Sequence, residues 1–213
     1  GMENKTMNIQ NFNDFHCHLD MKAFAENGEA LVETFFQESS GYLITVADPY
    51  ETESHVRTQQ LVQAYDRAYT MTAAHPHNAD QYCEAVEERI LTFIPNEKVI
   101  AIGEAGLDFF YNLSEKDNQI RVFKRQIQIA KSHNLFLTVH SREAEALVLD
   151  ILEREKFDLP VVFHCYTGNI ENAKRIIDRG YYISFSGIIT FRQKKTEYLR
   201  EIVKMVPINQ ILS

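Results

Sequence analysis

The sequence predicts an α/β fold, specifically a (β/α)8 barrel in which only the beginning of the eighth strand is present. Apolar, β-rich runs alternate with segments of helical periodicity roughly every 25 to 30 residues, which is typical of strand–helix units around a parallel sheet. Runs such as Val99-Ile-Ala-Ile and Val161-Val-Phe are almost continuously apolar, as expected for strands that are buried on both faces. The chain has 213 residues, which is enough for one sizeable core.

Seven complete strand–helix units follow one another along the chain. The expected strands are, in order, Asn11–His18, Tyr42–Ala47, Tyr69–Ala74, Val99–Gly103, Leu135–His140, Val161–Cys165 and Tyr181–Phe185, with Gln210–Ser213 as the beginning of the eighth. No linker or low-complexity segment separates them, so residues 11–213 are expected to form a single barrel domain. Residues 1–10 are expected to lie outside it, as a residue left by tag cleavage and a polar leader.

The segments between the strands have the pattern of amphipathic helices. In Gln119–His133, the apolar residues Ile120, Phe123, Ile127 and Ala130 recur every three or four positions between charged residues. Such a stripe predicts a helix that packs one face against the sheet.

The composition is that of an ordinary globular protein. It has 45% apolar residues, but it contains no run of about 18 apolar residues and no basic leader before an apolar stretch, so we expect a cytoplasmic protein. The three cysteines show no Cys-x-x-Cys spacing and are expected to be free thiols. The net charge of −8 argues against broad electrostatic capture of nucleic acid. Residues 114–213 nevertheless carry a net charge of +4, against −12 for residues 1–113, which leaves room for a locally basic face.

Candidate metal ligands stand at the ends of several expected strands. His16 and His18 are alternate residues of one strand, so both imidazoles face the same side and could bind a single ion. Glu104, His140 and His164 each directly follow an apolar run. A lone histidine of this kind usually has a structural role. Because the carboxyl ends of all barrel strands open on one mouth, five such residues predict one shared metal site.

Two more residues are candidates for substrate binding. His75 precedes Pro76, where the third strand turns into a loop, and it could contact a substrate phosphate or cap the turn. Arg142 follows the fifth strand, and its planar guanidinium could pair with a phosphate or with a carboxylate such as Asp108.

The remaining histidines do not end an expected strand. His55, His77 and His133 are therefore not expected to be metal ligands, and His133 is expected near a helix C-terminus, where a positive charge is favourable. Three aromatic residues could stack on a base at the barrel mouth, namely Phe109, Phe110 and Tyr166. Packing is the more common role of aromatic residues in such a place.

Six motifs in a fixed order connect the sequence to a known family. They are Asp14-x-His-x-His-Leu-Asp, Ala74-His-Pro-His, Gly103-Glu-Ala-Gly-Leu-Asp-Phe-Phe, Val139-His-Ser-Arg-Glu-Ala, His164-Cys-Tyr-Thr-Gly and Tyr182-Ile-Ser-Phe-Ser-Gly. With these motifs the chain resembles, over nearly its whole length, the TatD family of metal-dependent deoxyribonucleases. The resemblance implies a TIM (β/α)8 barrel of the metal-dependent hydrolase type.

The resemblance also implies a ligand set and a reaction. His16 and His18 would bind one metal ion, His140 and His164 a second, and Glu104 would bridge the two as the catalytic group. Two divalent ions can clamp a scissile phosphate and activate water, which suits a 3′-5′ exodeoxyribonuclease acting on DNA ends, with no membrane or obligatory protein partner. The family is described as magnesium-dependent, whereas mixed imidazole and carboxylate ligands also suit manganese or zinc.

One departure from the family concerns the end of the sequence. The family continues beyond the position of Ser213 with Glu-Thr-Asp on the eighth strand, and that aspartate binds the first metal ion and activates the water. The alternative expectation is therefore a catalytically silent barrel that binds metal or nucleic acid. For an active protein, Glu104 is the best substitute base. Asp14, Asp20 and Asp108 are expected to orient the metal ligands without binding the metal ion themselves.

Overall fold

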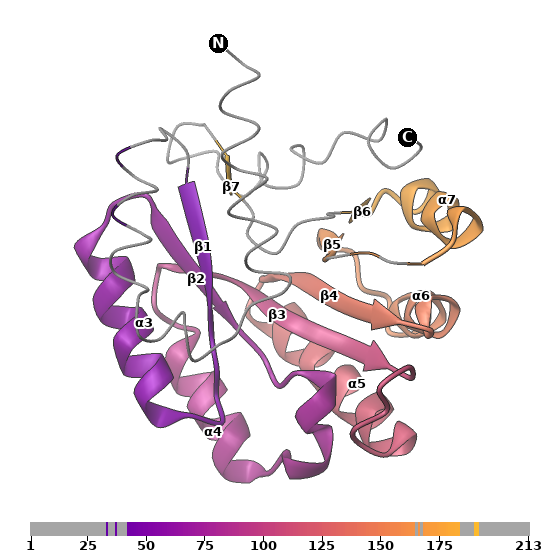
Figure 1. Ribbon diagram of the computed structural model, residues 1–213, viewed down its shortest axis with the longest axis horizontal. Coiled ribbons are helices and arrows are strands. Elements are labelled where there is room, and N and C mark those ends of the chain that lie inside the picture. The colour runs from indigo at the N-terminus through magenta and orange to yellow at the C-terminus, as the bar shows by residue number, and fades with distance from the viewer. Residues whose placement is uncertain are drawn as a thin grey trace.

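The computed structural model describes residues 42–164, 166, 168–183 and 190–191, together with the isolated positions 33 and 37. Strands and helices alternate along these residues (Figure 1). The strands are β1 (Tyr42–Ala47), β2 (Ala68–Thr72), β3 (Val99–Asp108), β4 (Phe136–Arg142), β5 (Val161–Phe163), β6 (Tyr182–Ile183) and β7 (Thr190–Phe191). The helices are α3 (Thr52–Ala64), α4 (Glu84–Phe93), α5 (Lys116–Ser132), α6 (Glu145–Arg154) and α7 (Ile170–Asp178), with a short 3-10 helix η1 (Pro76–Gln81) after β2.

The strands form one sheet in the order β6-β5-β4-β3-β2-β1-β7. All neighbours from β1 to β6 are parallel, and their order in the sheet follows their order in the chain, as the strand–helix repeat predicts. These six strands correspond to the second to seventh expected strands. The first expected strand, Asn11–His18, and the beginning of the eighth, Gln210–Ser213, lie outside the described residues. Strand β7, which pairs antiparallel with β1, was not expected.

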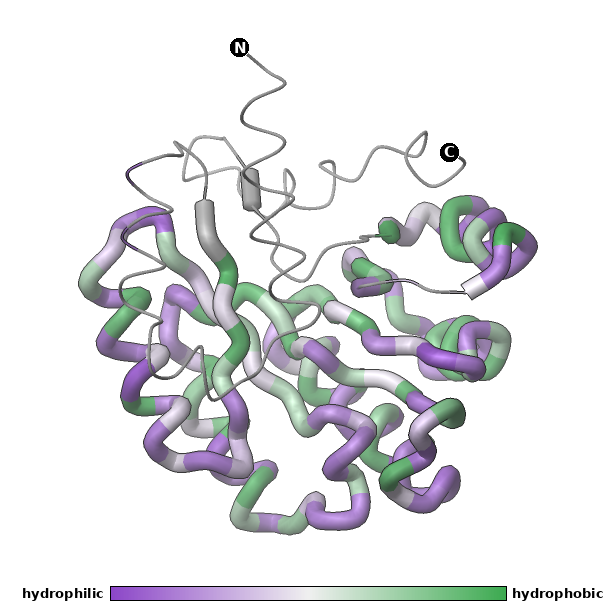
Figure 2. Tube along the Cα trace, in the orientation of Figure 1, coloured by the Kyte–Doolittle hydropathy of each residue, from purple (hydrophilic) through white to green (hydrophobic). Residues whose placement is uncertain are grey.

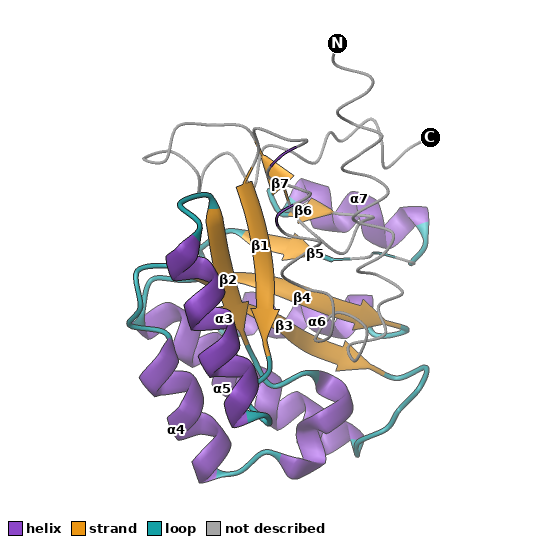
Figure 3. Cartoon of the chain, turned by 60° about the vertical axis from the view of Figure 1, so that its left-hand side comes forward, coloured by secondary structure: helices purple, strands orange, loops and turns teal. Residues whose placement is uncertain are grey.

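The helices lie on the outer side of the curved sheet (Figures 1 and 3). Phe123 and Ile127 of α5 are fully buried in the core between the sheet and the helices. On the opposite face of the strands, Tyr69, Met71 and Phe136 belong to a second buried cluster. Both faces are thus apolar, which explains the continuous apolar runs; Figure 2 shows these runs along the strands. Of the helices that the structure describes, none is long and apolar enough to cross a lipid bilayer.

Two buried glutamines of α5 hold the main chain at the ends of β2 and β3. Gln126 accepts a hydrogen bond from the backbone N–H of Ala74 (2.7 Å) and donates one to its carbonyl oxygen (3.0 Å). Gln119 does the same for Asp108, at 2.8 and 3.2 Å. The two glutamines are seven positions apart and so share one helix face. Helix α5 therefore fixes the backbone directly before His75 and at Asp108.

Replacing Gln126 with leucine is expected to lower the free energy of unfolding by about 2–4 kcal/mol, because the N–H and C=O of Ala74 would lose their partners in a buried place. Gln128→Leu on the same helix is the matched control. It removes a single bond to a carboxylate oxygen of Glu155 (2.6 Å) and should cost less than about 1 kcal/mol. Urea denaturation of both variants measures the difference. Equal losses of unfolding free energy would contradict the stabilising role of the hydrogen bonds between Gln126 and Ala74.

Candidate metal centre

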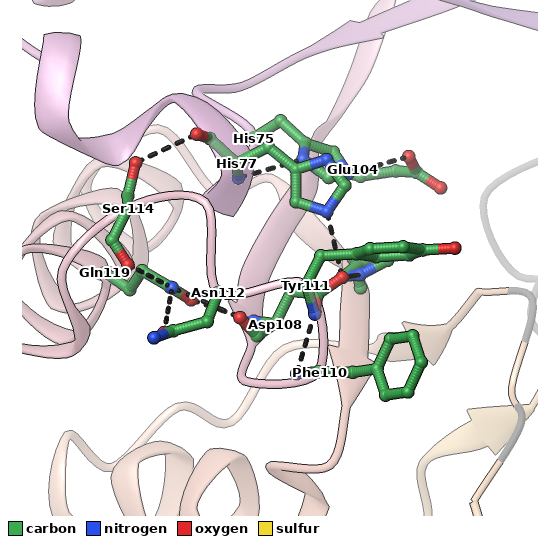
Figure 4. A network of polar contacts seen from close by, with 10 residues as sticks. His75, His77, Glu104, Asp108, Phe110, Tyr111, Asn112, Ser114 and Gln119 are labelled. Carbon is green, nitrogen blue, oxygen red and sulfur yellow. Dashed lines mark hydrogen bonds and ion pairs between the residues drawn. The ribbon is translucent and has the colours of Figure 1, made fainter.

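Six polar side chains come together at the carboxyl ends of β2 to β5, and Figure 4 shows His75, His77, Glu104 and Asp108 among them. His75 lies just before η1, His77 lies within it, Glu104 and Asp108 belong to β3, His140 belongs to β4, and His164 directly follows β5. In a parallel sheet with helical crossovers this edge is the one on which ligands are bound.

A β-bulge sets the direction of Glu104. In the pairing of β3 with β4, Gly103 lies opposite Thr138 and Ala105 opposite Val139, so that Glu104 is left out of the register. Its carboxylate reaches two imidazoles: Oε1 is 2.8 Å from Nε2 of His164, and Oε2 is 3.8 Å from Nε2 of His75. The side chain of Glu104 is 21% exposed, so the carboxylate remains accessible from the site.

The carboxylate of Asp108 is buried and fully engaged. Its Oδ2 atom lies 2.9 Å from Nε2 of His77 and 2.8 Å from Nε2 of His140. Its Oδ1 atom accepts hydrogen bonds from the backbone N–H groups of Phe110 (3.1 Å) and Tyr111 (2.8 Å). Asp108 thus orients two histidines with one oxygen and the following loop with the other.

The electrostatics of the site keep both carboxylates ionised. Burial by itself raises the pKa of Glu104, but the neighbouring imidazoles, that of His164 first, outweigh it and hold the pKa well below its ordinary value. The pKa of Asp108 is also lowered, because hydrogen bonds from His140 and His77 outweigh its burial. Burial lowers the pKa of His75 to about 3, although the charge of Glu104 opposes this shift.

The turn at His75 determines which of its ring nitrogens accepts a hydrogen bond and which donates one. Nδ1 of His75 accepts a hydrogen bond from the backbone N–H of His77 (3.2 Å), which caps the start of η1. In a neutral ring with Nδ1 as acceptor, the proton resides on Nε2. His75 therefore presents an N–H donor on the side that faces Glu104.

The donor set of the site fits a divalent metal ion. Ring nitrogens of His75, His77 and His140 lie within 4.8 Å of one another, although in the tautomer described above His75 offers an N–H donor there and not a free nitrogen. Two ligand atoms bound to one ion in tetrahedral geometry at about 2.0–2.2 Å are about 3.3–3.6 Å apart, so the imidazoles would have to approach one another by about 1 Å to share an ion. With two ionised carboxylates beside the imidazoles, the ligand types suit zinc, manganese or iron better than an all-oxygen site would.

The structure brings four of the predicted site residues together, namely His75, Glu104, His140 and His164. His16 and His18 lie outside the described residues. Arg142, the remaining candidate, lies with its guanidinium 4.0 Å above the ring of Phe110. Since both oxygens of Asp108 are engaged elsewhere, the interpretation of Arg142 as the partner of Asp108 is not supported.

Sequence reasoning missed His77, which the structure places next to His75 and His140. Its ring centroid is 4.3 Å from that of His75 and 5.7 Å from that of His140. The available signal was the His-x-His spacing after β2, which is the same spacing that drew attention to the first strand. His133, at the C-cap of α5, binds the carbonyl oxygen of Ile129 as expected for a helix end.

Comparisons with known proteins agree with this geometry. The family model described as TatD related DNase matches residues 13–213. The uncharacterized metal-dependent hydrolase YabD of Bacillus subtilis is 32% identical over 93% of this chain and 77% of that protein. The 3′-5′ ssDNA/RNA exonuclease TatD of Escherichia coli K12 is 31% identical over 93% of this chain and 76% of that protein. A crystal structure of the TatD homologue YJJV from Escherichia coli has a TM-score of 0.68 and 26% identity, covering 79% of this chain and 64% of that one.

The parallel sheet, the histidine and carboxylate cluster at its strand ends and these relatives define a metal-dependent hydrolase that acts on ester bonds. The likeness to a TatD structure confirms the predicted α/β class and TIM barrel fold. The chain belongs to the TatD family.

Proposed function

We propose that this chain hydrolyses phosphodiester bonds of single-stranded nucleic acid and removes nucleotides from the 3′ end. The observation that carries the proposal is the convergence of four histidines and two carboxylates on one edge of the sheet. Relatives that are 31–32% identical over 93% of the chain are named 3′-5′ ssDNA/RNA exonucleases, which supports this substrate class. Their names also favour hydrolysis over a silent binding protein.

Two divalent ions, magnesium, manganese or zinc, are part of the proposal. Glu104, His140 and His164 would hold one of them, and His16 and His18 would hold the other together with Glu104 as the bridging ligand. When bound, such ions lower the pKa of a water molecule and stabilise negative charge on a phosphate. Glu104 suits the bridging role because its two oxygens face different imidazoles and because its low pKa keeps it charged.

The other residues of the site have distinct tasks in this proposal. His75 presents its Nε2–H group to a phosphate oxygen of the substrate, because Nδ1 already accepts from the turn. The low pKa of His75 keeps its imidazole neutral near neutral pH, so that the ring carries one N–H group, at Nε2, as the donor. Asp108 holds His77 and His140 in fixed orientations. Carboxylates that orient metal-binding histidines in this way typically matter for affinity and rate.

The test is nucleotide release from single-stranded DNA under magnesium, manganese and zinc, with substrates blocked at either the 3′ or the 5′ end. We expect activity that a chelator removes and that a 3′ block, but not a 5′ block, prevents. Glu104→Ala, purified identically, excludes a contaminating nuclease. Binding of the DNA without release under any of the three metals would instead favour the silent barrel.

A further inference from the structure

A pocket lies at two of the strand ends that carry the candidate metal centre. It has a volume of about 660 Å³, which is within the range of pockets that hold small ligands. Its walls come from the loop after β3, the segment after β4 and the start of α7. Phe109 follows Asp108 by one residue, and Arg142 follows His140 by two, so the pocket and the metal centre share two strand ends.

Two exposed aromatic rings lie on the β3 side: Phe110 lines the pocket, and Tyr111 is the next residue of the same loop. Phe110 is 49% and Tyr111 is 54% exposed, although large apolar side chains are usually covered. The two rings are in edge-to-face contact with centroids 4.9 Å apart. The guanidinium of Arg142 lies 4.0 Å from the ring centroid of Phe110 and 4.9 Å from that of Tyr111. This arrangement combines the two kinds of planar group on which nucleic acid bases stack.

The aromatic pair is held in a fixed relation to the metal centre. The backbone N–H groups of both residues donate to Oδ1 of Asp108, whose other oxygen contacts His77 and His140. The ring of Tyr111 also meets that of His77 edge-on, with centroids 5.7 Å apart. Figure 4 shows Phe110 and Tyr111 next to Asp108, with the Phe110 ring directed away from the histidines. A base stacked on these rings would therefore lie at a defined distance from the reacting phosphate.

The charges around the pocket favour a base over a phosphate. Arg142 is its only cationic lining residue among those that the structure describes, whereas Glu143 and Glu145 bring two carboxylates. The amides of Asn169 and Asn172 complete the polar part of the wall. A phosphate would meet repulsion from the two carboxylates, but an uncharged base can use amide and carboxylate groups as hydrogen-bond partners.

We propose that Phe110, Tyr111 and Arg142 form a stacking platform that holds the base of the nucleotide adjoining the scissile bond. The proposal deepens the proposed function and rests on it for the identity of the substrate. It assigns a substrate-positioning role to two aromatic residues outside the histidine and carboxylate cluster.

The test uses a single-stranded DNA pentamer with phosphorothioate linkages and 2-aminopurine one nucleotide from its 3′ end, whose fluorescence falls when the base stacks. Binding is measured to the full chain and to its variants Phe110→Ala, Phe110→Leu and Leu113→Ala. We expect the unmodified chain to quench the fluorescence and Phe110→Ala to weaken binding by about tenfold. Phe110→Leu, which keeps apolar bulk without a ring, should lose the quenching as well. Leu113 is 62% exposed in the same loop and serves as the control, with binding unchanged.

A second probe with an abasic nucleotide at the same position isolates the base. Phe110→Ala should bind this probe as well as the unmodified chain does, because the probe has no base at the position that would stack on Phe110. Equal affinities of Phe110→Ala and Leu113→Ala for the intact probe, or no quenching by the unmodified chain, would overturn the platform. Release of nucleotides from an ordinary phosphodiester pentamer is measured in parallel. Quenching without release of nucleotides supports the stacking platform but refutes the proposed function. Release with a KM that is unchanged in Phe110→Ala supports the proposed function but refutes the stacking platform.

Discussion

Replacing Glu104 with glutamine is expected to lower kcat/KM for nucleotide release by about 10³-fold, because stabilisation of charge by metal ions is worth several kcal/mol. The substitution preserves the shape of the side chain but removes its negative charge. Glu104 faces His164 at 2.8 Å and His75 at 3.8 Å, and an amide in this place cannot attract cations as a carboxylate does. The loss should appear mainly in kcat, since the contacts of the substrate with Arg142 and the aromatic loop are untouched.

Two measurements separate a chemical effect from a structural one. Equilibrium dialysis should show that Glu104→Gln holds fewer divalent ions, while its circular dichroism stays that of the unmodified chain. Glu87→Gln provides the control, because this carboxylate pairs with Arg125 between α4 and α5 and should leave kcat/KM unchanged. Activity of Glu104→Gln within about tenfold of the unmodified chain would be incompatible with a bridging ligand, since several kcal/mol correspond to more than that.

The sequence allows the order of the strands to be predicted, but not all of their ends. The apolar runs that predict β1 to β6 are continuous, because both faces of the sheet are buried. Strand β3 was expected to end at Gly103 and instead continues to Asp108. The prediction failed because two glycines within four residues are typical of a turn. Here the bulge at Glu104 and the close approach at Gly106 allow the pairing with β4 to continue.

The candidate site could be predicted where a polar residue follows an apolar run, as Glu104, His140 and His164 do. It could not be predicted where the decisive contact is made across the fold. Nothing in the sequence near Gln126 indicates that its amide binds the main chain of Ala74, which is 52 residues away. The local pattern of α5 predicts only its apolar stripe. A glutamine between the apolar positions of that stripe is equally compatible with exposure to solvent. The position of His77 depends in the same way on the tight turn of η1.

Gly106→Ala is expected to destabilise the fold by about 3 kcal/mol or more, because the new methyl group would overlap the main chain of the neighbouring strand. A Cβ atom at this position would collide with the carbonyl oxygen of His140 and lie 2.9 Å from its carbonyl carbon. Main-chain atoms in a paired strand cannot rotate away as a side chain can. The φ angle of Gly106 is +149°, a conformation that other residues rarely adopt. The strain would fall on the pair of strands that carries Asp108 and His140.

Gly180→Ala makes the same chemical change without the collision. Its φ angle is +77°, and among the described residues no atom beyond its two chain neighbours lies within 4 Å of the added Cβ, so the backbone conformation is what opposes the substitution, at about 1 kcal/mol. Both variants reduce the entropy of the unfolded chain equally, so the difference between their urea midpoints reports the overlap with His140 together with the difference in backbone strain at the two positions. Equal midpoints would mean that β3 and β4 can move apart at little cost. In that case the distance of 2.8 Å between Asp108 and His140 could not be a fixed feature of the site.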